Sequence, residues 1–511
     1  MTVYKKLVAM LRSPNFFRVT LVLFLIQGTF FALAVNPSLQ STQEGSTYLD
    51  RSIGQVPDGN RHMAAIYHFA AQPLTNGPFI QDMTDAELMM GDLVRFPSYF
   101  YYYLLSFPVR AAVALDMSDL AIVYLVRFIG LGFGVLALVV FRRIVQEVRA
   151  GPVITNLATF ALAITGAFAY FAPAENYDML ALLLWFCVVL ASIRLYTRRD
   201  PVQLYWVVVA TLFLSITKYT YVPFAGVVVL AALVFYIRDT KGMAAAWKHA
   251  RKHYAEYWNK LAGWRQAALV VLLLVGAGLF VERIGVNLVQ YQSVSPNCAV
   301  VHSRESCLNF SVYNRNVNRI DAVAAGETWT KDYHAVEYTG AWLQRYYPTM
   351  YYYMGHIWVY DIWVMLWVSV GVVVALVLGA LIYLVVKRRR ILQGKVEWML
   401  LGIVGLLTAG QYGYNAMLFI KYSGQMYGHQ GRYLLPAIGF LYVIMLLIVA
   451  RAYYALPAKY KKIAVVALVC TGVFAAIING ALLNFFIHAT GPDWYSEFGK
   501  WLVPDSWYEN R

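Results

Sequence analysis

The sequence predicts an all-α polytopic membrane protein with about eleven transmembrane helices, juxtamembrane helices and external loops. Of the 511 residues, 60% are apolar and only 14% are charged, whereas average soluble domains have roughly 45–50% apolar and 25% charged residues. Apolar runs long enough to cross a bilayer as helices recur along the whole chain. The same composition excludes an intrinsically disordered chain, which is poor in apolar residues and rich in charge.

The basic residues predict how these spans are oriented. The net charge is +15, but the cations cluster in short loops between apolar runs, which is the pattern of the positive-inside rule. The N-terminal segment carries Lys5, Lys6, Arg12 and Arg18 without an acid, so we expect it to stay in the cytoplasm. No nucleic-acid-binding motif accompanies the cations, and nucleic acid is not an expected partner.

Eleven spans place all strongly basic loops on one side of the membrane. The predicted spans are 17–35, 120–141, 154–171, 179–196, 204–216, 222–237, 267–281, 362–386, 399–419, 433–450 and 463–486. Two long segments, 36–118 and 282–358, then form external loops, and a tail, 487–511, also lies outside. We take 1–450 as the transmembrane core and 451–511 as the last transmembrane helix with its external tail.

Two further segments are predicted as helices that lie on the membrane. The stretch 100–115 is apolar, but Pro108 and Arg110 interrupt it, so we expect a juxtamembrane helix on the outer face with its tyrosines at headgroup level. Those tyrosines are Tyr99, Tyr101, Tyr102 and Tyr103. The cytoplasmic stretch 238–265 mixes many cations with Trp and Tyr, which is typical of an amphipathic helix on anionic lipid.

The four cysteines divide into two kinds. Cys187 and Cys470 lie in predicted spans, where free cysteines usually pack as small apolar residues. Cys298 and Cys307 lie nine positions apart in the second external loop. They form either a disulfide in an oxidising compartment or two unpaired thiols, while zinc is not favoured because no second cysteine or histidine pair accompanies them.

Polar residues at the predicted outer face are the candidates for function, because charges at membrane depth are costly and usually mark a site. In the first external loop, Asp58 precedes two histidines, His62 and His68. Asp58 is a candidate general base, or a group that orients a hydroxyl acceptor. The alternative is a solvated turn acid, because Pro57-Asp58-Gly59 is also an ordinary turn sequence.

Two short turns between predicted spans carry the next candidates. Asn176 and Asp178 would bind an acceptor or a metal, with Asp178 as a second acid, or else one of them caps the following helix. Lys218, followed by Tyr219, lies on the outer side against the positive-inside bias. It would pair with a lipid phosphate, or simply extend from the helix end to the interface.

The stretch before the tenth span suggests a phosphate site. It reads Tyr427-Gly428-His429-Gln430-Gly431-Arg432-Tyr433. Glycine lets a backbone approach an anion closely, a helix N-terminus carries partial positive charge, and arginine binds phosphate as a two-pronged donor. The alternative is a tight turn with Arg432 anchored to lipid headgroups.

The acids of 82–92 are weaker candidates, and several familiar motifs are missing. Asp82, Asp85, Glu87 and Asp92 resemble a metal-binding group, but a solvated loop or the acidic first turn of a helix is the favoured interpretation. The chain has no P-loop, GxGxxG, HExxH or GxSxG motif. We therefore expect any chemistry to take place outside, on a lipid-borne substrate.

Six stretches of the sequence, taken in order, resemble the GT-C superfamily of polytopic glycosyltransferases. These enzymes take sugar from a polyprenyl-phosphate carrier. Within that superfamily the chain is most similar to a family of bacterial polytopic membrane proteins, over about residues 17–450. The matching pieces are Pro57-Asp58 with His62, Phe96-Pro97-Ser98-Tyr99 with Tyr103-Leu104-Leu105, Tyr124-Leu125-Val126-Arg127, Asn176-Tyr177-Asp178, Lys218-Tyr219-Thr220-Tyr221 and Gln430-Gly431-Arg432-Tyr433-Leu434-Leu435-Pro436.

The resemblance implies roles for these residues. Asp58 would take the proton of an acceptor hydroxyl, Asp178 would orient the acceptor or share that role, and one displacement would invert the anomeric centre. Lys218, His429 and Arg432 would stabilise the leaving phosphate. The substrate-binding candidates are His62, Asn176, Lys218, Tyr219, His429, Gln430, Arg432 and Tyr433. An aromatic cap over the sugar would come from Trp329, Trp342, Tyr346 and Tyr347.

The resemblance also implies partners and a location. The donor would be a polyprenyl-phosphate-linked hexose or pentose, the acceptor a cell-envelope glycan or lipid, and the membrane a bacterial cytoplasmic (inner) membrane with the site facing the periplasm. Family members often carry Asp-Glu where this chain has Asp58-Gly59, so no cofactor is fixed and a divalent metal remains open.

Two other functions remain open from the sequence. A polymerase or ligase of polyprenyl-diphosphate glycans would need more external arginines and no catalytic acid in the first loop. A lipid or glycan transporter would favour internal repeats and acids in mid-span.

Overall fold

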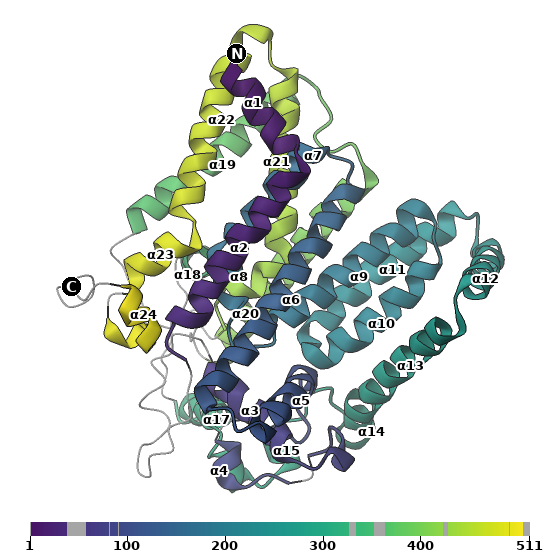
Figure 1. Cartoon of the computed structure of the whole chain (residues 1–511), viewed down its shortest axis with the longest axis vertical. Coiled ribbons are helices and arrows are strands. Elements are labelled where there is room, and N and C mark those ends of the chain that lie inside the picture. Colours follow the sequence, from purple (N-terminus) through teal and green to yellow (C-terminus); the bar gives the residue numbers. More distant parts are fainter. Residues whose placement is uncertain are drawn as a thin grey trace.

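The structure is a computed structural model, and the residues that it describes are 2–37, 58–80, 82–89, 91–326, 334–351, 363–422, 428–489 and 491–503. Within these ranges every regular element is a helix, and the helices run mostly lengthwise through the molecule (Figure 1). The only backbone pairings of strand type among the described residues are two single bridges, Val35 with Tyr495 and Thr165 with Gly480. The predicted all-α fold is confirmed.

Eight helical segments in the described part of the chain are long and apolar enough to cross a membrane. Their main helices are α2 (Pro14–Ala34), α6 (Asp119–Glu147), α9 (Asp178–Arg198), α11 (Val222–Asp239), α13 (Gly263–Phe280), α19 (Trp363–Val386), α21 (Leu435–Ala455) and α22 (Ala458–Ile478). Each coincides with a predicted span. The chain is therefore a polytopic membrane protein.

The other three predicted spans also fall on helices, although these do not meet the same length and hydropathy criteria. They are α7 (Pro152–Ile164) with α8 (Gly166–Phe171), α10 (Val202–Thr217) and α20 (Lys395–Lys421). The remaining helices are α1 (Thr2–Arg12), α3 (Gly59–Ala71), α4 (Asp85–Leu88), α5 (Phe100–Ala114), α12 (Met243–Lys260), α14 (Val286–Tyr291), α15 (Cys298–Val301), α16 (Arg304–Cys307), α17 (Ser311–Ala324), α18 (Ala335–Tyr351), α23 (Ala481–His488) and α24 (Glu497–Leu502).

Two spans that were predicted as continuous are each broken. The helix predicted over 154–171 stops at Thr165, whose hydroxyl donates to the Ala161 carbonyl. The helix predicted over 463–486 stops before Gly480, where a Cβ would lie 2.7 Å from the Ala476 carbonyl oxygen. The two breaks lie side by side, because Thr165 and Gly480 form a single antiparallel bridge.

The core lies around α9. In its most apolar stretch 72% of the residues are buried, whereas only 6% are buried in that of α22 and 11% in that of α19. Trp185 and Phe186 of α9 pack with Phe141 of α6 and Phe440 of α21. Helices such as α19 and α22 therefore present most of their apolar side chains outward, as expected of helices whose solvent is lipid.

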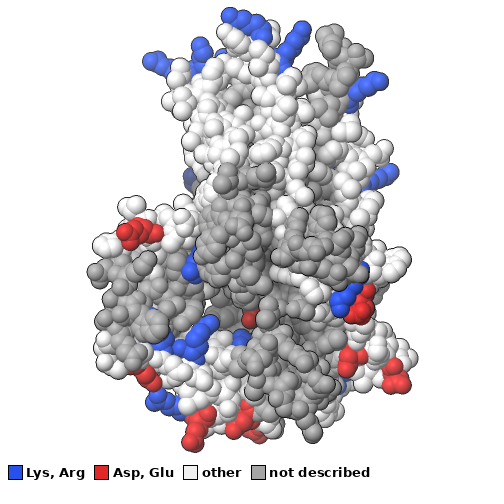
Figure 2. Space-filling model, turned by 90° about the vertical axis from the view of Figure 1, so that its left-hand side faces the viewer, with Lys and Arg blue, Asp and Glu red and all other residues white. Residues whose placement is uncertain are grey.

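Charge is distributed unevenly along the long axis. Figure 2 shows Lys and Arg without acidic neighbours at the upper end, whereas the acidic side chains on this face lie lower. The N-terminus lies at the upper end and α3 and α5 at the lower end (Figure 1). This is the asymmetry that the positive-inside rule describes, and the candidate residues near α3 lie at the end away from the basic cluster.

Both predicted membrane-surface segments form helices, but three of the four tyrosines that were expected at headgroup level are buried in protein. Tyr99, Tyr101 and Tyr102 are buried, because α5 packs against α3 rather than lying open on a surface. In α12 the indole of Trp247 is 72% exposed, as an amphipathic helix at an interface requires.

The C-terminal residues pack on the transmembrane core. The Ser496 amide donates to the Ala34 carbonyl at the end of α2, and the Asn36 amide donates to the Trp494 carbonyl. Phe485 of α23 packs against Phe31 of α2. The described part of 451–503 therefore shares a hydrophobic core with the helices before it.

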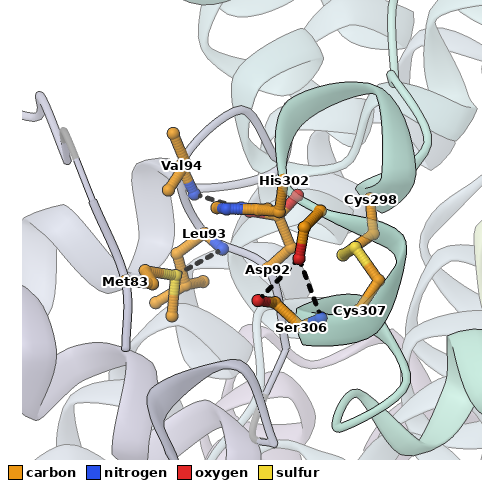
Figure 3. The surroundings of a disulfide bond; sticks show 9 residues. Met83, Asp92, Leu93, Val94, Cys298, His302, Ser306 and Cys307 are labelled. Carbon is orange, nitrogen blue, oxygen red and sulfur yellow. Dashed lines mark hydrogen bonds and ion pairs between the residues drawn. A yellow bond between two sulfur atoms is a disulfide. The ribbon is translucent and has the colours of Figure 1, made fainter. Parts of the chain in front are cut away.

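The segment that was predicted as the second external loop contains a disulfide between Cys298 and Cys307, as one of the two sequence interpretations expected. Figure 3 shows the bond beside Asp92, Leu93 and His302, and His302 Nε2 lies 3.1 Å from Asp92 Oδ1. The two sulfur atoms pack on Leu88 of α4. Thr84 caps α4 together with Glu87, and two of the four acids, Asp85 and Glu87, lie in the first turn of this helix, as the favoured interpretation expected.

Candidate functional site

Four of the predicted site residues meet although they are far apart in the sequence. Asp58 precedes α3, Asp178 begins α9, Lys218 ends α10, and Arg432 lies in the short helix η4 (Gly431–Leu434) that leads into α21. Their charged groups form one chain of ion pairs, in the order Asp58, Arg432, Asp178 and Lys218.

Lys218 and Asp178 form the inner pair of this chain. Lys218 Nζ lies 2.6 Å from Asp178 Oδ1, and the side chains are only 5% and 6% exposed. Lys218 also lies above the rings of Tyr177, Tyr221 and Tyr433 at 4.9 to 5.4 Å. The interpretation of a lysine that extends to the interface is thus wrong, because its ammonium is enclosed by a carboxylate and aromatic rings.

A side chain in the turn before α9 holds the backbone of Asp178 in place. Asn176 Oδ1 accepts a hydrogen bond of 2.9 Å from the Asp178 amide. The residue before α9 is Tyr177, so Asp178 is not the N-cap, whereas the Asn176 side chain does bond the first amide of the helix, as the capping interpretation expected. The carboxylate of Asp178 is instead occupied by two cations.

Arg432 joins the inner pair to Asp58. Its Nη1 lies 3.8 Å from Asp178 Oδ2 and its Nη2 lies 3.3 Å from Asp58 Oδ2. The guanidinium lies 5.3 Å from the ring centres of Phe171 and Tyr433 and its side chain is only 7% exposed. Arg432 is therefore part of the protein interior and not a residue anchored to headgroups, as the alternative interpretation had it.

Asp58 is the exposed end of the chain. Its side chain is 40% exposed, and Arg61, one turn further along α3, lies 3.6 Å away. Its backbone has φ of 62°, a left-handed conformation that few residues other than glycine adopt. Aspartate tolerates it better than most residues, and such conformations tend to occur at functional sites.

His62 adds no positive charge to the site at neutral pH. Its ring is buried against Tyr177, and its Nδ1 lies 2.7 Å from the Tyr102 hydroxyl. Burial lowers the pKa of His62 from 6.5 to about 4, although Asp58 acts in the opposite direction. Among the described residues, the ion-pair chain and Arg61 then contain three cations, Arg61, Lys218 and Arg432, against two carboxylates, which leaves one positive charge.

Several buried polar atoms at the site lack hydrogen-bond partners. In the part of the chain that the structure describes, these include the donors Arg432 Nε and Asn176 Nδ2 and the acceptor Gln430 Oε1. Buried donors are nearly always paired in folded proteins. Two donors without partners among the described residues, beside this positive charge, make the region the candidate site for an anion.

The segment that carries Arg432 is held in place by α18. The Gly431 amide donates to Thr349 Oγ1 at 2.6 Å. Tyr346 donates to Asn415 Oδ1 of α20 at 2.6 Å, and Trp342 stacks on Tyr346. Two of the four predicted cap aromatics thus lie against this segment, although they face protein neighbours.

The other predicted residues lie at various distances from the ion-pair chain. His429 Nε2 lies 3.3 Å from the Tyr338 hydroxyl, so the imidazole faces α18. The Tyr219 amide donates to Ser98 Oγ at 3.2 Å. Tyr347 stacks on Trp367, away from Trp342. Pro57, Trp329 and Tyr427 lie outside the described residues.

Sequence reasoning missed the partner of one buried charge next to the site. Arg127 of α6 pairs with Glu175 at 2.7 Å, and both side chains are buried. Arg127 also donates to the carbonyls of Ala32 and Val35 at the end of α2. A cation within an apolar span was a signal that an acid must lie nearby, and Glu175 precedes Asn176 directly.

No group of three or more His, Cys, Asp or Glu side chains among the described residues could hold a metal ion. The candidate site is therefore defined by its ion pairs and by its unpaired donors.

Comparisons of the sequence with models of protein families and with curated proteins find no match. Solved structures with some similarity include an oligosaccharyltransferase of Archaeoglobus fulgidus tethered with an acceptor peptide, at TM-score 0.40 and 12% identity over 93% of this chain and 55% of that one. The oligosaccharyltransferase AglB of the same organism, in complex with an inhibitory peptide and a dolichol-phosphate, has TM-score 0.38 and 12% identity over 91% of this chain and 55% of that one.

The apo form of the Archaeoglobus fulgidus oligosaccharyltransferase has TM-score 0.36 and 12% identity over 93% of this chain and 58% of that one. This chain thus spans little more than half the length of these proteins. All three TM-scores are low, and the function is argued below from the residues of the site.

Proposed function

We propose that the chain is a membrane glycosyltransferase that moves a sugar from a polyprenyl-phosphate carrier to a cell-envelope glycan or lipid. The observation that carries this proposal is the exposed carboxylate of Asp58 beside the buried guanidinium of Arg432, 3.3 Å apart. Glycosyl transfer needs a base for the acceptor and positive charge for the leaving phosphate. The resemblance to GT-C glycosyltransferases supports the same assignment.

The reaction would be one direct displacement. Asp58 takes the proton of the acceptor hydroxyl while the hydroxyl oxygen attacks the anomeric carbon of the donor. The bond between that carbon and the phosphate oxygen breaks, and the phosphate leaves with the electron pair. Because the acceptor approaches from the side opposite the leaving group, the anomeric configuration inverts.

The two carboxylates would differ in role. Asp178 is buried and held by Lys218 and Arg432, so it suits a positioning residue that fixes the two cations. Arg432, with Nε free of partners among the described residues, would bind the phosphate. Asn176, Gln430, Tyr219 and Tyr433 would line the substrate, and His62 and His429 would hold the neighbouring aromatic residues.

The proposed setting is a bacterial cytoplasmic membrane with the site on the periplasmic side. Arg432 and Asp58 lie with α3 at the end of the molecule away from the basic N-terminus, which supports this orientation. A carrier lipid would then present its phosphate at the membrane surface.

Glycan analysis of a strain that lacks this chain tests the proposal. The wild-type chain is expected to restore a missing envelope sugar, and Asp58→Asn to restore less than about 1% of it, since a general base contributes roughly 10²- to 10⁴-fold. Asp116→Asn is the matched control, because Asp116 is also an exposed aspartate with positive φ, 55°, but lies outside the site. Full restoration by Asp58→Asn would show that the assigned base is wrong.

A further inference from the structure

The two carboxylates that contact Arg432 are held very differently. Asp178 is 6% exposed and is fixed by a second cation, Lys218, at 2.6 Å. Asp58 is 40% exposed and lies 3.3 Å from Arg432 and 3.6 Å from Arg61, which are longer contacts than that of Asp178 with Lys218. An anion that approaches from outside therefore meets the replaceable partner of Arg432 first.

Arg432 can bind only part of an incoming anion while both carboxylates stay in place. Asp178 contacts Nη1 and Asp58 contacts Nη2, and Nε has no partner among the described residues. A phosphate group has several acceptor oxygens and fits two adjacent nitrogens of a guanidinium. Binding through Nη2 and Nε would satisfy the unpaired donor and would occupy the position that Asp58 now takes.

We propose that the ion pair of Asp58 with Arg432 is a resting-state latch, which a phosphate-bearing ligand opens by displacing Asp58 from the guanidinium. The exchange couples the two halves of the site, because the same step that seats the phosphate frees the carboxylate. The role of the freed carboxylate as a base rests on the proposed function. The exchange of partners at Arg432 does not.

The neighbours of Asp58 suit such an exchange. Arg61 is bound to Ser311 of α17 and lies over the ring of Phe310, so it stays in place when Asp58 moves. After the exchange, the Asp58 carboxylate would still lie near the guanidinium of Arg61, one helical turn away. On the inner side, Lys218 keeps Asp178 fixed, so Arg432 retains one anchor while its other partner changes.

Competition between Asp58 and phosphate sets the size of the expected effect. Ion pairs with one exposed partner contribute little, so removing Asp58 should strengthen phosphate binding by about two- to fivefold. The effect should shrink as salt is added, because exposed charges are screened.

Binding of inorganic phosphate and of farnesyl phosphate to the full-length protein in detergent tests the latch. Asp58→Asn is expected to bind at least one of them two- to fivefold more tightly than the wild type. Asp116→Asn, which removes the same charge at a distance from Arg432, should bind as the wild type does. Asn is chosen because it tolerates the left-handed backbone of residue 58.

The two probes separate the sources of the phosphate. Tighter binding of both supports a latch that responds to any phosphate, and tighter binding of farnesyl phosphate alone supports one that responds to a lipid headgroup. Unchanged or weaker binding of both by Asp58→Asn overturns the latch. Arg432→Gln is expected to abolish the binding of both probes.

Infrared difference spectroscopy gives a second readout that net charge alone would not produce. Adding phosphate should shift a carboxylate stretching band in the wild type and in Asp116→Asn, and this shift should be missing in Asp58→Asn. A spectrum in which no carboxylate band responds would overturn the exchange. The proposed glycosyl transfer could still hold in that case, since its test is the restoration of the sugar.

Discussion

Two clusters of buried charge differ in how their polar atoms are satisfied. One surrounds Arg283, in the short π-helical turn η3 (Val281–Gly285) between α13 and α14. Its Nη atoms donate to the carbonyls of Leu93, Phe96 and Pro78, and its Nε donates to Glu282. The other cluster is the ion-pair chain around Arg432, where side chains pair with side chains and Arg432 Nε has no partner among the described residues.

The difference separates structural charges from candidate functional ones. Backbone carbonyls are fixed by the fold, so Arg283 holds the backbone of Pro78, Leu93 and Phe96 against the π-helical turn. Arg95 binds the same turn through Glu282, and it also binds Asn287. Carboxylate partners can move and can exchange for a ligand. A buried arginine held by backbone carbonyls thus suits a structural role, whereas one held by carboxylates, with a nitrogen unpaired among the described residues, suits the proposed binding role.

The largest effect is expected from removing the structural arginine. Arg283→Met leaves three buried carbonyls without a donor, and losing one member of a buried charged cluster destabilises by about 3–5 kcal/mol. Thermal unfolding in detergent should show a large drop in the midpoint, together with a low yield of monodisperse protein. Arg251→Met, at an exposed position on α12, is the control and should behave as the wild type.

A smaller loss is expected at the inner pair of the candidate site. Lys218→Met leaves Asp178 with Arg432 alone, and breaking a buried pair in this way destabilises by about 3 kcal/mol. The double variant Lys218→Met with Asp178→Asn should recover part of the stability, because the two groups are coupled. Lys252→Met removes an exposed lysine whose partner is 3.9 Å away and should change stability by less than about 0.5 kcal/mol.

If the double variant were as unstable as the sum of the two single ones, Lys218 and Asp178 would act independently. The inner pair would then not be the fixed support that the comparison requires.

Gly431→Ala tests whether α18 positions the binding arginine. A Cβ at this residue would lie 2.7 Å from Met350 Cα and would overlap backbone that cannot rotate away. Overpacking of this kind usually destabilises by roughly 1–3 kcal/mol, and the shift of Arg432 should weaken phosphate binding. Gly413→Ala meets nothing within 4 Å and should leave both stability and binding intact.

The transmembrane helices were predictable because each bilayer crossing needs a long apolar run, and such a run can be recognised from consecutive residues alone. The breaks at Thr165 and Gly480 were not predictable in the same way. The two breaks pair through one bridge across more than 300 positions, and the hydropathy of one apolar run does not depend on a partner so far away in the sequence.

The site was predictable in its residue types but not in its pairing. Asp58, Asp178, Lys218 and Arg432 stand out because charges are rare near apolar spans. Nothing in their spacing shows that Lys218 pairs with Asp178 or that Arg432 lies between two carboxylates, since these contacts depend on how the helices pack. Arg283 escaped attention because it follows a span directly, where a cation has an ordinary explanation at the interface.

The smallest expected effect concerns His62, which borders both carboxylates without pairing to either in a hydrogen bond that the structure shows. Its pKa falls from 6.5 to about 4 on burial, so the folded state binds fewer protons than the unfolded state between these two values. Stability that is complete above pH 6.5 should therefore decline as the pH falls toward 4, by up to about 2 kcal/mol between pH 7 and pH 5.

His62→Gln removes this titrating group while keeping a polar side chain near Tyr102. The unfolding midpoint of the variant should depend less steeply on pH between 7 and 5 than that of the wild type. Equal slopes would mean that the pKa of His62 is the same in the folded and the unfolded protein, so that below about pH 6.5 the imidazolium would be a fourth cation of the site. The comparison of the two charge clusters would then have to include His62, because an anion at Arg432 would also lie near the imidazolium.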